Sequence, residues 1–177
     1  MKKLLLLALV ALGVYMAATE SGNRTFTRIW ASVAGKPALD LDFMALSSQI
    51  DENQLAQRFS SLKLRCNAEQ SNLGDRVCTS EIRAINDVPA QYAAFFFKDS
   101  RLSNVKLALS GRDHPKLTEK LKAQYGAWQT VGSRNDIHGN PIVGWHLDSG
   151  ILAISETVPE NAESTVLWIS SQALLTR

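Results

Sequence analysis

The stretch QYAAFFFKDSRLSNVKLALS, residues 91–110, decides the fold class because it reads as a β-hairpin. Residues 102–110 alternate between two kinds of side chain, and successive residues of a strand point to opposite faces. One face carries Val105, Leu107 and Leu109, and the other carries Lys106, Ala108 and Ser110. Asp99-Ser100 supplies a tight turn. The pattern therefore predicts two antiparallel strands with one buried face.

Aromatic residues suggest a surface for a binding partner. Phe95, Phe96 and Phe97 are consecutive, so Phe96 must face away from its two neighbours. If helices cover only one face of the sheet, Tyr92 and Phe96 are exposed or covered by a partner. The alternative is that helices and the preceding connector bury both faces. The predicted partner surface consists of Tyr92, Phe96, Trp128, Trp145 and Trp168.

Cys66 and Cys78 are the only cysteines, and their setting predicts a structural disulfide. Residues 62–66 and 77–82 read as strands, and Asn72-Leu73-Gly74-Asp75 between them is a turn signal. An antiparallel pair would place the two sulfurs opposite each other. The alternatives are a redox pair or a zinc site, but the sequence lacks the CxxC spacing and the neighbouring histidine that these would need.

Two segments have the signals of amphipathic helices. Asp51 is followed three residues later by Gln54, which predicts a capping box. The second helix begins at Asp113 or His114, with Pro115 in its first turn, and ends at Gly126. Its apolar stripe consists of Leu117, Leu121 and Tyr125. The lysines on its other side are expected to form a solvated face.

The last third of the sequence returns to strands. Residues 142–147 and 151–157 form a hairpin across Asp148-Ser149-Gly150, and residues 165–171 form a final strand. We therefore expect an α+β domain with a mainly antiparallel sheet of about six to seven strands and two helices packed on it, preceded by an N-terminal apolar helix.

The N-terminus carries a positive region followed by an apolar run. Met1-Lys2-Lys3 precedes Leu4 to Ala18, and lysines beside such a run stay on the cytoplasmic side. The sequence thus predicts a signal anchor or a cleaved signal peptide at 1–18, a connector at 19–40 and one periplasmic α+β domain at 41–177. The anchor would be a single span with a cytoplasmic N-terminus at the bacterial inner membrane. Cleavage near Thr19 would instead give a soluble periplasmic or secreted protein.

The charge balance argues against nucleic acid as a partner. The chain has 19 Lys and Arg against 17 Asp and Glu, but Lys2 and Lys3 belong to the leader. The remaining chain is neutral, whereas nucleic-acid binders carry a basic surface.

No group of residues forms a recognisable catalytic, metal or cofactor motif. A metal site would require Asp136, His138 and His146 to converge, and nothing in their spacing forces this. Ser149 lies in a hairpin turn, unlike the nucleophile of hydrolases. We therefore expect no catalysis, no cofactor and no metal. The function expected is that of a membrane-anchored accessory or assembly protein that binds a partner protein. The alternatives are a secreted binder or inhibitor, or an envelope hydrolase using His138 or His146.

Overall fold

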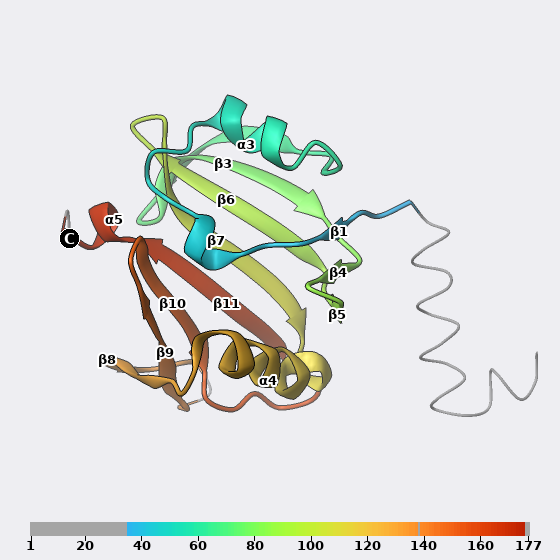
Figure 1. The fold of residues 1–177 in the computed structure, drawn as a ribbon, viewed down its shortest axis with the longest axis vertical. Coiled ribbons are helices and arrows are strands. Elements are labelled where there is room, and N and C mark those ends of the chain that lie inside the picture. Colours follow the sequence, from blue (N-terminus) through green and yellow to red (C-terminus); the bar gives the residue numbers. More distant parts are fainter. Residues whose placement is uncertain (1–34, 138, 176–177) are drawn as a thin grey trace, which may run out of the picture. The chain divides into compact units, whose positions relative to one another are not determined.

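Eight strands pair into one antiparallel sheet in the computed structural model, which describes residues 35–137 and 139–175 (Figure 1). In spatial order the strands are β2 (Arg65–Ser71), β3 (Gly74–Glu81), β6 (Tyr92–Lys98), β7 (Arg101–Ser110), β11 (Glu163–Ser170), β10 (Gly150–Ser155), β9 (Pro141–Leu147) and β8 (Gln129–Asn135). The predicted α+β class with a mainly antiparallel sheet is confirmed. The expected strand number was too low, because the polar sequence of β8 gives no strand signal.

The hairpin at residues 91–110 is β6 and β7, as predicted. Its turn residues Asp99 and Ser100 have φ angles of 50° and 62°. Two successive positive φ angles define the type I′ turn, whose twist matches that of the flanking strands. Phe95 pairs with Val105, and both lie in the main hydrophobic core.

The domain begins before the predicted start at residue 41, because a small second sheet includes residues of the predicted connector. This sheet consists of β1 (Ala38–Leu39), β4 (Ala84–Ile85) and β5 (Val88–Pro89), with β1 parallel to β4. The compact unit accordingly begins at Pro37, so the last residues of the predicted connector belong to the fold. The predicted apolar helix at the N-terminus lies outside the described residues.

The two longest helices that the structure describes begin near the predicted positions. They are α3 (Glu52–Arg58) and α4 (His114–Tyr125); the short elements are η1 (Phe43–Ala45), η2 (Gly111–Asp113) and α5 (Ser171–Leu175). The capping box is confirmed, because Gln54 N donates to Asp51 Oδ1 at 2.8 Å and Asp51 N donates to Gln54 Oε1 at 3.0 Å. Gly126 ends α4 with a φ of 83°.

Both helices pack on the same face of the sheet. Leu55 of α3 and Leu117 and Leu121 of α4 share one core with Phe95 and Trp168 of the strands. A separate, smaller cluster of strand residues lies on the other face; it is formed by Val77, Ala94 and Phe96 with Leu73 and Tyr92 beside them. We call this second face the open face, since no helix residue belongs to its cluster in the described part of the chain.

The element order repeats itself. α3 is followed by the meander β2-β3-β6-β7, and α4 is followed by the meander β8-β9-β10-β11. The two meanders run in opposite spatial order and meet where β7 pairs with β11 (Figure 1). Each half therefore consists of a helix and a four-stranded meander, related by an approximate two-fold arrangement.

Candidate partner-binding face

Strand register determines which side chains line the open face. One row across neighbouring strands runs through Phe96, Asn104, Ile169 and Ile151. The next row runs through Ala94, Lys106, Leu167 and Ala153. Because side chains that pair directly across strands point to the same face, these two rows lie on the side of the sheet away from α3 and α4.

In the first half of the sheet, the chain covers its own open face. Leu73, at the turn between β2 and β3, packs against the cluster that contains Phe96. Its carbonyl oxygen accepts hydrogen bonds from Ser103 Oγ and Asn104 Nδ2, both at 2.6 Å. Gly74 permits this packing, because a side chain there would collide with the backbone carbonyl of Phe97. Phe96 is left only 9% exposed.

In the second half, apolar side chains on the open face keep contact with solvent. Ile151, Leu167 and Ile169 are partly exposed, and none of them belongs to either hydrophobic cluster. The turn between β8 and β9 corresponds to the turn that carries Leu73, but its Ile137 is 95% exposed. We call Ile151, Leu167 and Ile169 the apolar strip. Contiguous apolar side chains of this kind often mark an interaction surface.

Lys106 lies beside the apolar strip and keeps a positive charge there. Its Nζ is 3.7 Å from Glu163 Oε1 and 5.6 Å from the centroid of the Tyr92 ring. The hydrogen bond with Tyr92 is the main cause that raises the pKa of Lys106, against the opposing effect of burial. The Lys106 ammonium group, positioned by Glu163 and Tyr92, therefore lies next to the apolar strip. A charge at the margin of an interface orients a partner more than it adds affinity.

The five aromatic residues predicted to form a partner surface do not come together. Trp168 is fully buried in the main core, and Trp145 is 4% exposed. The Trp128 ring packs edge-on against Trp145, with the ring centroids 6.1 Å apart, and Lys122 Nζ lies 3.5 Å from the centroid of the Trp128 ring. Only Tyr92 and Phe96 lie on the open face. The structure therefore does not bring the five residues onto one face, because alternation along β11 turns Trp168 toward the helices.

The sequence did contain a signal for the apolar strip. In β10 and β11 both sets of alternate residues are largely apolar: Leu152 and Ile154 point to the core, while Ile151 points to the open face. An apolar run without alternation is typical of a strand with two apolar faces. The predicted partner surface did not include these residues because it was made of aromatic side chains, whereas the apolar strip contains only aliphatic ones.

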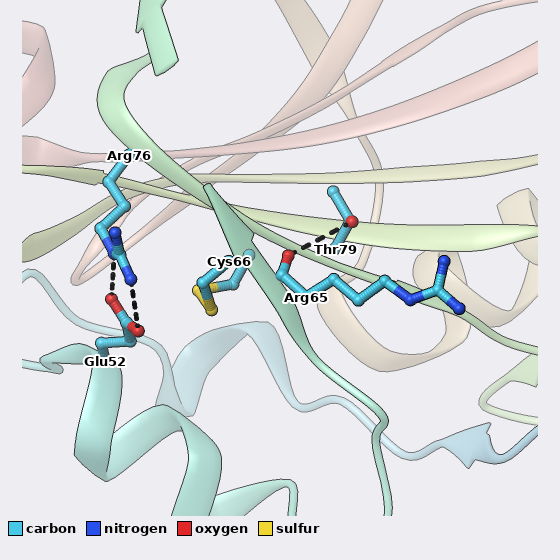
Figure 2. Close-up of a disulfide and its surroundings, with 6 residues drawn as sticks. Glu52, Arg65, Cys66, Arg76 and Thr79 are labelled. Carbon is cyan, nitrogen blue, oxygen red and sulfur yellow. Dashed lines mark hydrogen bonds and ion pairs between the residues drawn. A yellow bond between two sulfur atoms is a disulfide. The ribbon is translucent and has the colours of Figure 1, made fainter. Parts of the chain in front are cut away.

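The cysteines form the predicted disulfide across β2 and β3, where Cys66 and Cys78 pair directly. Figure 2 shows Glu52 of α3 bonded to Arg76 of β3 beside it, with Arg76 Nη2 3.1 Å from Glu52 Oε1. The Glu52 carboxylate and the two sulfurs lie within 4.8 Å of one another. Metals bind thiolates, however, and both sulfurs are consumed by the disulfide. The oxidised hairpin is a structural element.

The two histidines that the structure describes lie in different settings. His114 is 4% exposed, with Nδ1 2.8 Å from Ser164 Oγ, so it packs inside the domain and does not serve as an exposed helix cap. Burial lowers the pKa of His114. His146 is exposed and pairs with Ile151 at the margin of the open face. Asp136 accepts a hydrogen bond from Asn140 N at 2.8 Å within its own turn. His138 lies outside the described residues.

No protein-family model, curated protein or solved structure matches this chain significantly. Among the helices that the structure describes, none has the length and apolar character that crossing a membrane requires.

Proposed function

We propose that this protein is a non-catalytic partner-binding module of the bacterial cell envelope, held at the inner membrane by Leu4 to Ala18. The observation that carries the proposal is the apolar strip, which stays partly exposed while both helices cover the opposite face. In this proposal the strip binds a partner protein of the membrane or periplasm in an accessory or assembly role.

Three features of the described domain support a protein partner. The strip is made of side chains from two paired strands, as in sheets that pack against another sheet or a helix. In the first half of the sheet, Leu73 packs on the corresponding part of the open face. An aliphatic side chain of a partner could make the same kind of contact with the apolar strip. Lys106 and Glu163 supply charges at the margin, where interfaces are commonly polar.

Site-specific photo-crosslinking in cells tests the proposal. A benzophenone amino acid at Leu167, in the middle of the strip, is expected to give one discrete adduct of higher mass, identified by mass spectrometry. Placing Ile151→Lys in the same chain should remove the adduct. The partner would then have to bury the introduced ammonium group, and the loss of its hydration opposes binding. Both positions are partly exposed, so the folded domain should tolerate the changes.

Met44 provides the matched control. It is a 53% exposed apolar residue in η1, on the side of the helices. The benzophenone residue there should give no adduct, and Met44→Lys should leave the Leu167 adduct intact. Equal adducts from both positions, or an adduct made only of a second copy of the chain, would contradict the proposal.

N-terminal sequencing of the purified protein tests the anchor separately from partner binding. A mature start near residue 20 would exclude the anchor and favour a released binder.

A further inference from the structure

The two halves of the sheet resemble each other in sequence as well as in strand order. β6 and β10 have the same place in the two meanders, as do β7 and β11. Residues 93–95 of β6 have the sequence AAF, and residues 152–154 of β10 have LAI. Residues 103–105 of β7 have SNV, and residues 164–166 of β11 have STV. The open faces of the two halves can therefore be compared position by position.

The first turns of the two meanders also correspond. The β2–β3 turn has the sequence NLGD at 72–75, and the β8–β9 turn has DIHGN at 136–140. Both contain a polar residue, an aliphatic residue and a glycine in this order, with one extra residue in the second turn. The matched pairs are Leu73 with Ile137 and Gly74 with Gly139.

The β2–β3 turn lies closed against the open face. Leu73 packs on three residues that are each at most 9% exposed, namely Val77, Ala94 and Phe96. The backbone of the turn is also close to the sheet, since a side chain at Gly74 would collide with the Phe97 carbonyl oxygen. The first half of the open face is therefore covered by its own turn.

The β8–β9 turn lies away from the sheet. Ile137 is 95% exposed, and a Cβ atom at Gly139 would meet no described atom within 4 Å. The residues that correspond to those beneath Leu73 are partly exposed; they are Ile142, Ala153 and Ser155. Of these, Ile142 and Ser155 pair directly, as Val77 and Phe96 do in the first half. One molecule thus shows the same kind of turn in a closed and in an open position.

The two hairpins differ in what holds them together. In each, the register shifts just before the turn, which interrupts the ladder of hydrogen bonds. The first hairpin is crosslinked by Cys66 and Cys78, which pair directly. The corresponding pair in the second hairpin is Thr130 and Val143. The β8–β9 turn therefore lacks the crosslink that restricts its counterpart.

We propose that the β8–β9 turn is a lid that closes over the second half of the open face, where Ile137 packs on Ile142 and Ala153. Closing removes an exposed aliphatic side chain from water, which favours the closed position, whereas the lost freedom of the turn opposes it. Ala153 pairs with Leu167, so the closed lid lies beside the apolar strip and competes there with a partner. The closing depends on this chain alone; its effect on partner binding rests on the proposed function.

Methyl NMR of the full chain in mild detergent, with labelled alanine, isoleucine and leucine, tests the lid without a partner. A nuclear Overhauser effect between the Ile137 and Ala153 methyl groups is expected, and the one between Leu73 and Ala94 is its positive control. Ile137→Asp should shift the Ala153 signal, whereas Met44→Asp, at an exposed apolar residue on the side of the helices, should not. Absence of the Ile137–Ala153 effect while the Leu73–Ala94 effect is present overturns the lid. So does an Ala153 signal that ignores Ile137→Asp.

The photo-crosslink from Leu167 tests the regulatory role in cells. Ile137→Asp removes the closed position and should raise the yield of the partner adduct about twofold, the gain expected when the lid is closed half of the time. Met44→Asp should leave the yield unchanged. An unchanged or lower yield with Ile137→Asp overturns the competition between lid and partner. Absence of any adduct in the unmodified chain contradicts the proposed function instead, and the NMR result then decides the lid.

Discussion

His114 illustrates how one buried polar residue ties a helix to the sheet. It opens α4, yet its ring lies against β11, with Nδ1 2.8 Å from Ser164 Oγ and Nε2 3.5 Å from the Glu156 carbonyl oxygen. Thr118 Oγ1 lies 3.5 Å from the same Nε2. Burial lowers the pKa of His114 below its usual value of 6.5. The folded protein therefore holds a neutral imidazole.

This neutral imidazole predicts a loss of stability in mild acid. Well above pH 6.5 the ring is neutral in both states, and its contribution to stability is constant. As the pH falls below 6.5, the unfolded chain binds the proton first, so the free energy of unfolding decreases until the pH passes the lowered folded-state pKa. The slope can reach about 1.4 kcal/mol per pH unit. Urea unfolding between pH 7.5 and 5 measures it.

His114→Gln should lower the stability at pH 7.5 but flatten the dependence on pH, because it removes the titrating group. His146→Gln is the matched control, since it removes an exposed imidazole that lies outside this buried contact. A wild-type slope that persists in His114→Gln would assign the acid sensitivity to other groups.

At the scale of elements, the disulfide hairpin joins three parts of the fold. Cys66 and Cys78 link β2 to β3, and Glu52 of α3 bonds to Arg76 of β3 (Figure 2). The turn of the same hairpin covers the open face through Leu73. Among the strands that the structure describes, β2 lies at the edge of the sheet and pairs only with β3, and the disulfide reinforces that pairing.

Removing the disulfide should destabilise the domain by about 3 kcal/mol, because closing a loop of this length restricts the unfolded chain. The double variant Cys66→Ser/Cys78→Ser and the reduced wild type should show the same lowered midpoint in urea. As a control, dithiothreitol should not change the midpoint of the double variant. If the double variant and the reduced wild type both kept the midpoint of the oxidised wild type, the disulfide would not contribute to the stability of the domain.

At the scale of the whole molecule, the two meanders meet at β7 and β11. These two central strands are paired on both sides, whereas β2 and β8 are the edges of the sheet. β8 also has an irregular register with β9 between Thr130 and Asn135. Stability should therefore fall from the centre of the sheet to its edges, and most steeply toward β8.

Amide hydrogen exchange checks this gradient. The slowest amides should lie in β7 and β11, and those of β8 should exchange fastest among the eight strands, since an edge strand with irregular pairing opens without global unfolding. Uniform protection across the sheet would mean that it opens only as a unit. Slower exchange in β8 than in β11 would contradict the two-meander description.

The sequence by itself determined the local features: the β6–β7 hairpin, the capping box at Asp51, the end of α4 at Gly126 and the facing cysteines. Alternation, caps and turns act between residues a few positions apart, so they can be read along the chain. Which face lies open was decided only by the tertiary structure. Both helices pack on one side, and Leu73 covers Phe96 but leaves Ile151, Leu167 and Ile169 uncovered. Such coverage depends on contacts between distant segments, which no local pattern encodes.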